Sequence, residues 1–469
     1  MRPTIDASPP VHALPRIQPV PIETSSASVA LGASVGSAAF VGAAAPVAPV
    51  APDVTTMEAT RASVSPSVLF VDQSGQLGGA EFALLQLAGH CAAYSEVVLL
   101  SDGPFRTRLE ALGARVQVIS DARVSGIARQ ASGWNCLRVL PGIFRQVRAI
   151  ATRARDFDVL FLNTQKALVL GVLGKPLHRK PVIWYQHDIL TRNHFGRVQL
   201  TVVKWLVRFA VDQVVVNSQA SARSLAALTG VAADSVPVIY NGIDAAAFSR
   251  VEGADGAIGA IGADGAIGAD GVDRADIAAL RHRLGLPADA WLAGLFGRLA
   301  PWKGQHVALD AIARLPGTHL VLVGAPLFGE DAYAQRLHEQ AAALGIADRV
   351  HFAGFQDDVP AWMSAMDVIL HTSTEPEPFG RVIVEGMAAA RPVIAAAAGG
   401  VTEIVRHRHN GWLVKPGDVG ALAEAIGTLR DDPVLAQRLA RQARDDARSA
   451  FSVEQYLEKM TQAIRRVAR

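Results

Sequence analysis

The stretch EPEPFGRVIVEGM, residues 375–387, combines two glutamates with a glycine turn and the start of a helix. Glu377 precedes a proline, which favours extended backbone, and Phe379 and Gly380 then turn the chain. From about Gly380 the segment has the pattern of a helix, so Glu385 lies about 7.5 Å along its axis. The first amides of such a helix bind anions. Carboxylates on both sides of that anion site can hydrogen-bond sugar hydroxyls, so the stretch predicts a nucleotide-sugar site.

Short apolar segments alternate with longer helical ones on both sides of residue 250. The apolar segments are VLFVD (68), EVVLL (96), RVQVI (115), DVLFL (158), PVIWY (181), QVVVN (213) and PVIYN (237), followed by WLAGLFG (291), HLVLVG (319), VHFAG (350), DVILHTS (367), PVIAA (392) and GWLV (411). Strands that are apolar throughout are typical of a parallel sheet with helices on both faces. The order predicts an α/β protein with two doubly wound, Rossmann-like domains. In such sheets, ligands bind beyond the carboxyl ends of the strands.

Length, net charge and cysteine content limit the possible classes of protein. A chain of 469 residues is too long for a single domain with one hydrophobic core. Its net charge of +2 gives no reason to expect a nucleic acid partner. The two cysteines, Cys91 and Cys136, indicate free thiols in a reducing compartment rather than a disulfide framework. We therefore expect a cytoplasmic protein with two or three domains.

Two segments have a biased composition. Residues 1–65 are rich in Ala, Pro, Ser and Val, and the uncharged run 24–52 holds Ala, Gly, Ser and Pro rather than Leu and Ile. This favours a disordered tail over a membrane span or signal segment, with a later start at Met57 as an alternative. Residues 253–271 repeat GADGAIGA-like units without an apolar face, which predicts a flexible surface insertion. The predicted organisation is a tail (1–65), a first Rossmann-like domain (66–250), the insertion (251–274), a second Rossmann-like domain (275–450) and a C-terminal helix (451–469).

Two strand ends in the first domain carry candidate binding residues. Gly78 and Gly79 form a loop that a phosphate or sugar can approach closely, although a glycine pair before a helix can also serve packing alone. His187 and Asp188 end the segment WYQHD, where a strand reaches the ligand-binding edge of the sheet. A histidine there can contact a ligand or be structural, and Asp188 can support it or contact a substrate.

The segment 197–211, RVQLTVVKWLVRFAV, predicts a helix with Lys204 and Arg208 on one side. Residues 67–250 contain 20 Lys and Arg against 12 Asp and Glu. With Trp205 and Phe209 nearby, this surplus suits an anionic membrane surface or a lipid-linked acceptor. The alternative is a buried crossover helix with basic edges, which the high apolar content of the segment favours slightly.

The segment LFGRLAPWKG, residues 295–304, places two cations beside a glycine turn. Gly297 allows the strand to end in a sharp turn, and Arg298 and Lys303 follow it. Negative charge accumulates on a diphosphate as a glycosidic bond breaks, and cations at this position can stabilise it. The segment therefore predicts a site for a diphosphate leaving group.

Four motifs occur in order: GGAE from residue 78, WYQHD ending at 188, GRL-x3-KG from 297 and E-x7-E from 377. With the strand pattern, this set resembles the retaining glycosyltransferases of family 4, which have the GT-B fold. The resemblance covers about residues 67–465, apart from the insertion. It implies two Rossmann-like domains that face a cleft, with the C-terminal helix crossing back onto the first domain.

The resemblance also implies roles for the candidate residues. The expected catalytic residues are His187, Glu377, Arg298 and Lys303. The expected donor-binding residues are Gly78, Gly79, Arg298, Lys303, Gly354, Phe355, Phe379, Gly380 and Glu385. Arg298 and Lys303 would hold the diphosphate and Glu385 the ribose. Glu377 would contact the sugar, and His187 would reach it from the opposite domain.

The reaction implied is transfer of a sugar from a UDP- or GDP-linked donor to a glycan or lipid-linked acceptor, with retention of configuration. Because no carboxylate is clearly placed as a nucleophile, front-face attack is favoured. No cofactor is expected, and the protein's own cations would replace a metal. High alanine content suggests a GC-rich bacterial genome, which makes cell-surface polysaccharide or glycolipid biosynthesis the expected context. A cytoplasmic location at the inner face of the membrane would fit this context.

Other classes of protein remain open at this stage. A sugar-nucleotide epimerase on the same fold would interconvert the donor without an acceptor. A phosphorylase would need a pyridoxal-binding lysine, which the sequence does not identify. A non-catalytic binding subunit would not need the full charged set of Arg298, Lys303, Glu377, Glu385 and His187.

Overall fold

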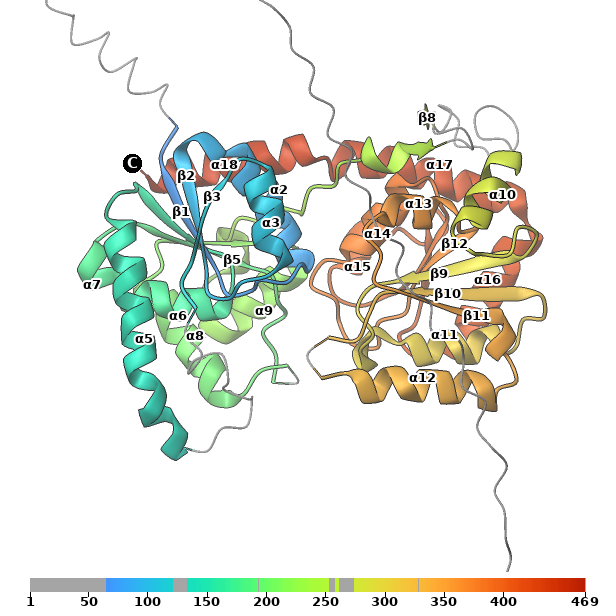
Figure 1. Cartoon of the computed structure of the whole chain (residues 1–469), viewed down its shortest axis with the longest axis horizontal. Coiled ribbons are helices and arrows are strands. Elements are labelled where there is room, and N and C mark those ends of the chain that lie inside the picture. The colour runs from blue at the N-terminus through green and yellow to red at the C-terminus, as the bar shows by residue number, and fades with distance from the viewer. Residues whose placement is uncertain are drawn as a thin grey trace, which may run out of the picture. The chain divides into compact units, whose positions relative to one another are not determined.

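The computed structural model describes residues 65–120, 133–192, 194–252, 258–260, 274–327 and 329–468. The predicted tail, apart from residue 65, and most of the predicted Gly/Ala insertion lie outside this range. Two parallel six-stranded sheets dominate the described chain (Figure 1), which confirms the predicted class of two doubly wound, Rossmann-like units. We refer to the part built on the first sheet as the first lobe and to the part built on the second as the second lobe.

The first sheet has the strand order β3-β2-β1-β4-β5-β6 with every pair parallel. Its strands are β1 (Val68–Asp72), β2 (Ser95–Leu99), β3 (Arg115–Val118), β4 (Val159–Leu162), β5 (Val182–Gln186) and β6 (Gln213–Val216). Its helices are α2 (Gly79–His90), α3 (Pro104–Ala111), α5 (Gly133–Ala154), α6 (Gln165–Leu173), α7 (Lys175–His178), α8 (Arg197–Phe209) and α9 (Gln219–Thr229). This is the strand order of a dinucleotide-binding sheet. Strands β2 and β3 are added to one side of β1 and the last three strands to its other side, so the strand order reverses between β1 and β4. Ligands bind at the carboxyl ends of the strands beside that reversal.

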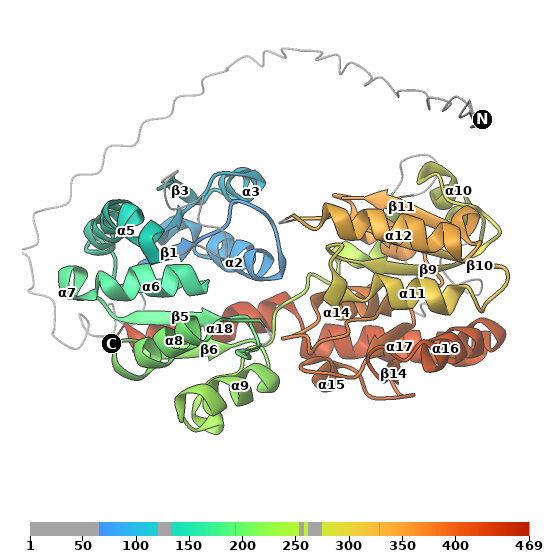
Figure 2. The same ribbon diagram turned by 90° about the horizontal axis from the view of Figure 1, so that it is seen from below.

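The second sheet repeats this arrangement with the order β11-β10-β9-β12-β13-β14. Its strands are β9 (Trp291–Phe296), β10 (Thr318–Val323), β11 (Val350–Gly354), β12 (Val368–His371), β13 (Val393–Ala396) and β14 (Trp412–Val414). The helices of this half are α10 (Arg274–Arg283), α11 (Gln305–Ile312), α12 (Asp331–Ala343), α13 (Val359–Ser364), α14 (Arg381–Ala388), α15 (Val401–Ile404), α16 (Val419–Asp431) and α17 (Pro433–Ala450). Helices α11, α12 and α16 share one apolar core, and α10, α13 and α14 share the other. Figures 1 and 2 show the positions of these helices around the second sheet.

Apolar side chains cover both faces of each sheet, as the continuous apolar strands predict. In the first lobe, Val147, Leu168 and Val203 of α5, α6 and α8 pack together on one face. Helices α2 and α3 cover the other face, joined by Tyr456 and Met460 from the far end of the chain. Both faces are therefore closed, and the strand ends are left to carry polar groups.

The structure differs from the sequence-based prediction at two places. The segment PVIYN is not a strand, because only an isolated bridge joins Val216 to Val238. Pro237 has no N–H to give to a neighbouring strand, and further on the Ile243 N–H donates to the Phe451 carbonyl instead, at 2.8 Å. Within the predicted insertion, β8 (Ile258–Ala260) pairs antiparallel with β7 (Arg250–Glu252).

The C-terminal helix α18 (Val453–Val467) packs against the first lobe. Ser452 caps it, with its Oγ accepting the Gln455 N–H at 3.3 Å. The Gln455 side chain donates to the Ser449 carbonyl rather than back to Ser452, so only half of a capping box forms. The buried Tyr456 hydroxyl donates to the Ala83 carbonyl at 3.0 Å. Along the part of the chain that the structure describes, no helix is both long enough and apolar enough to span a membrane.

Candidate active site

Two glycines shape the loop that follows β9. Gly297 has φ +127°, a conformation that other residues rarely adopt, and it lets the chain turn sharply at the end of the strand. Gly304 has φ +72°, and a Cβ atom there would lie 2.0 Å from the Thr372 carbonyl oxygen. The Thr372 hydroxyl in turn donates to the carbonyls of Lys303 and Gly304, at 2.9 and 3.0 Å. Lys303 is therefore held against the end of β12 by the backbone on both sides of it.

The Glu377 carboxylate accepts hydrogen bonds from three side chains. The Lys303 Nζ lies 2.9 Å from both carboxylate oxygens, the Ser373 hydroxyl donates at 3.0 Å, and the His371 Nε2 lies at 3.4 Å. Burial would raise the pKa of Glu377, but the charge of Lys303 and the contacts with His371 outweigh it and lower the pKa well below its usual value. Glu377 is therefore an anion held by a fixed cation.

His371 and Ser373 are functional candidates that the sequence analysis missed. Both lie at the carboxyl end of β12, where the sequence analysis took HTS only as the end of a strand. The available signal was the change from apolar to polar residues at a strand end, since ligands bind at that edge of a parallel sheet. Their contact with Glu377 places them in the same cluster as Lys303.

Glu385 has its own cation in the first turn of α14. The Arg381 Nε donates to the Glu385 Oε1 at 2.7 Å, and the same guanidinium donates to the Gly242 carbonyl at 3.3 Å. It also stands over the Phe82 ring, 5.1 Å from the centroid. Burial raises the pKa of Glu385, and Arg381 only partly offsets this rise. Arg381 therefore links the second-lobe helix α14 to two residues outside that lobe.

The remaining second-lobe candidates differ in what they expose. Phe355 is 61% exposed, directly after Gly354 with its φ of +68°. Phe379 is buried and stacks on Tyr240 with 6.0 Å between ring centroids, so only its backbone is free to contact a ligand. Gly380 has φ +101° and forms the N-cap of α14. Arg298 directly follows the Gly297 turn, and its carbonyl accepts the Gln305 side-chain amide at 3.0 Å.

In the first lobe, Gly78 and Gly79 begin helix α2. Gly78 is the N-cap, and a Cβ atom at Gly79 would meet no other atom within 4 Å. Glu81 follows in the first turn, and its pKa is raised to about 8 by burial and by the neighbouring charges of Asp72 and Asp188. The loop is therefore open at Gly79 and carries a carboxyl group that holds its proton to an unusually high pH.

The carboxyl ends of β1, β4 and β5 bring three polar side chains together. The Asn163 Nδ2 donates to the Asp72 Oδ2 at 2.6 Å, and the Asn163 Oδ1 lies 2.9 Å from the His187 Nε2. Burial lowers the pKa of His187 to about 3 and raises that of Asp72 to about 6. Burial also raises the pKa of Asp188, whose Oδ2 accepts the Gln165 amide at 3.3 Å. His187 is thus a neutral imidazole near pH 7.

Direct contacts join the first and second lobes. The backbone N–H groups of Gln219 and Ala220, at the start of α9, donate to the two carboxylate oxygens of Glu403, each at 2.7 Å. The His194 Nε2 lies 3.0 Å from the Glu375 Oε2. Glu403 follows the Gly399–Gly400 turn, and the Gly400 N–H donates to the Glu377 carbonyl at 2.8 Å. The Glu377 loop is therefore connected through Glu403 to the first lobe.

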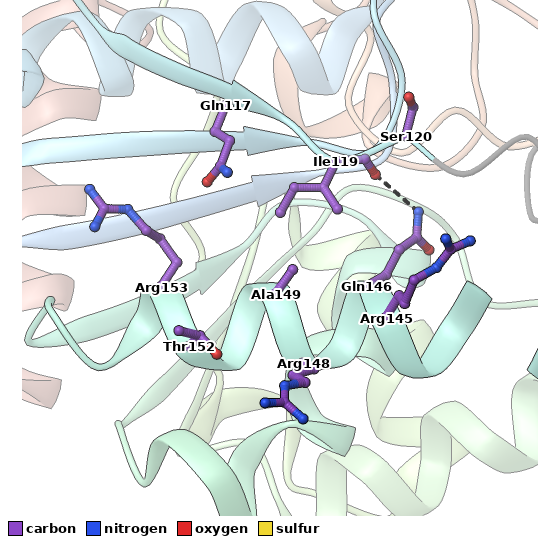
Figure 3. A pocket seen from close by; sticks show the side chains of 9 residues that line it. All are labelled: Gln117, Ile119, Ser120, Arg145, Gln146, Arg148, Ala149, Thr152 and Arg153. Atoms are coloured by element: carbon purple, nitrogen blue, oxygen red, sulfur yellow. Dashed lines mark hydrogen bonds between the residues drawn. The ribbon is translucent and has the colours of Figure 1, made fainter. Parts of the chain in front are cut away.

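A groove of about 590 Å³ lies elsewhere, between β3 and α5 (Figure 3). Its lining residues include Gln117, Ile119, Arg145, Gln146, Arg148 and Arg153. The Gln146 amide donates to the Ile119 carbonyl at 3.1 Å, and Arg153 forms an ion pair with the buried Glu96. The groove contains none of the residues predicted for the active site.

Models of known protein families match both lobes of the chain. A family model described as "Glycosyl transferases group 1" matches residues 276–446, and one described as "Glycosyltransferase Family 4" matches residues 77–247. The lipopolysaccharide core biosynthesis glycosyltransferase LpsE of Rhizobium meliloti is 38% identical over 178 residues, which is 38% of this chain and 51% of that protein. A D-inositol 3-phosphate glycosyltransferase of Acidothermus cellulolyticus is 34% identical over 244 residues, 50% of this chain and 49% of that protein. The chain spans about half the length of these curated relatives.

A solved structure matches over its whole length. The Anabaena protein Alr3699/HepE, crystallised with UDP and glucose, superposes with a TM-score of 0.74 at 36% sequence identity. The match covers 86% of this chain and 100% of that protein. A second structure of the same protein, in complex with UDP-glucose, has a TM-score of 0.73. The chain therefore belongs to the group 1 and family 4 glycosyltransferases with the GT-B fold.

Proposed function

We propose that the protein transfers a sugar, with retention of configuration, from a nucleoside diphosphate donor to a glycan or lipid-linked acceptor. The observation that carries this proposal is the half-buried Lys303–Glu377 pair beside the amino end of α14. It combines a cation for a diphosphate with a permanently charged acceptor of sugar hydroxyl hydrogens. The complexes of HepE with UDP and UDP-glucose support a UDP-linked donor, with a GDP-linked donor as the alternative.

The proposed roles follow the charges of the second lobe. Lys303 and Arg298, with the first amides of α14 after Gly380, bind the diphosphate. Glu385 binds the ribose, and Glu377 binds hydroxyls of the sugar. The nucleotide base contacts the backbone at Gly354 and the exposed ring of Phe355, and the open loop at Gly78 and Gly79 lies beside the phosphate or the acceptor.

The proposed reaction takes place on one face of the sugar. The bond between the anomeric carbon and the diphosphate oxygen breaks, and its electron pair leaves with the nucleoside diphosphate. The acceptor oxygen forms the new bond to the anomeric carbon, and its proton passes to the departing phosphate oxygen. Lys303 and Arg298 stabilise the charge that develops on the leaving group, which is the largest electrostatic change along the reaction.

Donor binding tests this proposal directly. The full chain and its Glu377→Gln variant would be screened by ligand-observed NMR against UDP-, GDP- and ADP-sugars and the bare nucleotides. We expect one sugar nucleotide to bind the wild type, and the signals of its sugar, but not of its base, to lose their contact effects in the variant. Absence of binding by every nucleotide and sugar nucleotide would contradict the proposal.

We further propose that the first lobe associates with an anionic membrane surface, at the inner face of the membrane in a bacterial cell. Helix α8 buries Leu200, Val203 and Val207 on one side. On another side it exposes a stripe at helical spacing: Val198 (79% exposed), Val202 (39%), Trp205 (59%) and Phe209 (69%). The Trp205 and Phe209 rings stack at 5.1 Å, and the exposed Lys204 and Arg208 flank them. The alternative of a buried crossover helix with basic edges does not account for this exposed apolar stripe, which suits an interface rich in anionic lipids.

Vesicle binding tests the membrane proposal. The wild type and a Trp205→Ser/Phe209→Ser double variant would be sedimented with phosphatidylglycerol–phosphatidylcholine vesicles and with pure phosphatidylcholine vesicles. We expect the bound fraction on anionic vesicles to fall severalfold in the double variant and the melting temperature to stay unchanged, because both side chains are exposed. Val434→Ser, at a still more exposed apolar side chain on α17, is the control. Equal binding by the wild type and the double variant would exclude α8 as the contact.

A further inference from the structure

Trp302 directly precedes Lys303, and its ring contacts the Lys303 ammonium group. The two residues end the short 3-10 helix Pro301–Lys303, and the Lys303 Nζ lies 4.2 Å from the centroid of the Trp302 ring. This distance is that of a cation–π contact, for which tryptophan offers the most favourable ring. Among the described residues, Trp302 packs into none of the four apolar cores, so core packing does not explain a tryptophan at this position.

The backbone around Trp302 is fixed by the loop that follows β12. The Trp302 carbonyl accepts the Thr374 N–H at 2.8 Å and the Thr374 hydroxyl at 3.3 Å. The Thr372 hydroxyl binds the carbonyls of the next two residues. The indole also meets the His194 ring in a T-shaped contact, with 6.4 Å between centroids and 76° between the ring planes. The Trp302 ring is therefore held beside the ammonium group both through its backbone and by a second ring.

The Lys303 ammonium group has two kinds of partner. Its Nζ lies 2.9 Å from both carboxylate oxygens of Glu377, and the Trp302 ring adds the cation–π contact. A second carboxylate in place of the ring would also hold the ammonium group, but it would cancel the positive charge that a diphosphate needs. An aromatic face attracts a cation through its quadrupole and carries no net charge. Trp302 can therefore fix the ammonium group without neutralising it.

We infer that Trp302 is a positioning residue, whose indole face holds the Lys303 ammonium group where the leaving diphosphate needs a cation. This inference rests on the proposed function and deepens it, because it adds a residue to the leaving-group site. Charge grows on the diphosphate as the glycosidic bond breaks, so a cation already in place stabilises the transition state more than the bound donor. Loss of the ring contact should therefore lower turnover more than donor affinity.

The contact can be detected without any ligand or activity. The ring current of an indole shifts protons over its face upfield, and the chain has only seven lysines whose side-chain signals must be resolved. In the full chain labelled with 13C-lysine, we expect the Lys303 ε-methylene protons to be shifted upfield in the wild type and to lose this shift in Trp302→Leu. Trp412→Leu removes a ring that contacts Arg408 instead and should leave the Lys303 signal unchanged. An unshifted Lys303 signal in the wild type would overturn the inference.

Fluorinated tryptophans separate the electron density of the ring from its shape, because fluorine withdraws density from the indole face and changes its size little. They would be placed at position 302 alone by nonsense suppression, with natural tryptophan inserted by the same route as the reference. The probe is UDP-glucose, and turnover is read as UDP released by hydrolysis. Tetrafluorotryptophan should lower kcat about 10-fold, the rate equivalent of one cation–π contact in a partly desolvated site. KM should change less than about twofold.

The outcomes at position 302 decide the role of the ring. We expect kcat to fall stepwise with the number of fluorine atoms, whereas the same series at position 412 should leave kcat unchanged. Equal kcat across the series at position 302 would overturn the inference, because the ring would then act through its shape alone. If the wild type binds neither UDP-glucose nor any other sugar nucleotide, the proposed function fails and the leaving-group role fails with it. The lysine spectra would still decide whether Trp302 holds Lys303.

Discussion

Glu377 and Glu81 are both largely shielded carboxyl groups near the carboxyl ends of the strands of a parallel sheet. Their pKa values are nevertheless shifted in opposite directions. Glu377 in the second lobe contacts Lys303, His371 and Ser373, and its pKa is lowered. Glu81 in the first lobe lies near the carboxylates of Asp72 and Asp188, and its pKa is raised to about 8. Burial acts the same way on both groups, so the difference comes from the sign of the neighbouring charges.

The comparison separates two kinds of binding surface. The second lobe keeps fixed charges in place, which suits a charged diphosphate and its leaving group. The first lobe places three uncharged groups, the His187 imidazole, the Asn163 amide and the protonated Glu81, beside the carboxylates of Asp72 and Asp188. Such groups exchange hydrogen bonds with hydroxyls without a large desolvation cost. Under the proposed function, the second lobe would bind the diphosphate end of a nucleotide sugar and the first lobe would face its sugar hydroxyls.

Removing the cation should have the largest effect, because it makes the environment of Glu377 resemble that of Glu81. We expect Lys303→Ala to lower turnover about 100-fold, the scale for losing one electrostatic donor to a leaving group. The assay is release of the nucleoside diphosphate with the donor identified by the binding screen. Lys415→Ala, at an exposed lysine of the same lobe, should retain wild-type turnover. A loss below about threefold in Lys303→Ala would contradict the leaving-group role.

The two glutamates should also contribute to folding stability with opposite pH dependence. Folded Glu81 keeps its proton to about pH 8, whereas an unfolded glutamate loses it near pH 4.3. The folded state therefore binds more protons between these values, and this group makes stability fall as the pH rises from about 4 to about 8. Glu377, with its lowered pKa, has the opposite sign: its contribution is present above about pH 4 and is lost in acid.

Glu81→Gln should remove the loss of stability at high pH. We expect the melting temperature of the variant to exceed that of the wild type at pH 8, and the two to differ little at pH 5, where Glu81 is protonated in the folded state. Scanning calorimetry at both pH values measures this. Glu110→Gln, at an exposed glutamate of the same lobe, should give equal differences at pH 5 and pH 8. If Glu81→Gln also changed the melting temperature equally at pH 5 and pH 8, Glu81 would be ionised in the folded protein at both pH values.

Glu403 gives an intermediate case and the smallest expected effect, since its two short hydrogen bonds come from helix amides and its cationic partner, Arg223, lies farther away at 3.8 Å. Glu403→Ala removes the partner of the Gln219 and Ala220 amides, which should cost the first turn of α9 about 1 kcal/mol. Hydrogen exchange of these two amides should accelerate about fivefold. The exposed Glu424→Ala is the control. Exchange at the wild-type rate in Glu403→Ala would show that the contact between the lobes contributes nothing to the stability of α9.

Much of the candidate site could be read from local sequence. Gly78, His187, Arg298 and Lys303 all lie at or just after the strand ends where the apolar pattern predicts a ligand. The pattern could not show that Lys303 binds Glu377, because the two residues are 74 positions apart and only packing brings them to 2.9 Å. It also missed His371 and Asn163, which lie at strand ends but belong to none of the recognised motifs.

The sequence by itself determined the two doubly wound lobes, because runs of apolar residues at strand and helix spacing act locally and repeat along the whole chain. It also determined which residues would reach the edges of the sheets. Only the tertiary structure decided their chemical state: that Glu377 is an anion, that Glu81 holds its proton, and that His187 is neutral. These properties depend on burial and on partners far apart in the chain, and both exist only once the chain has folded.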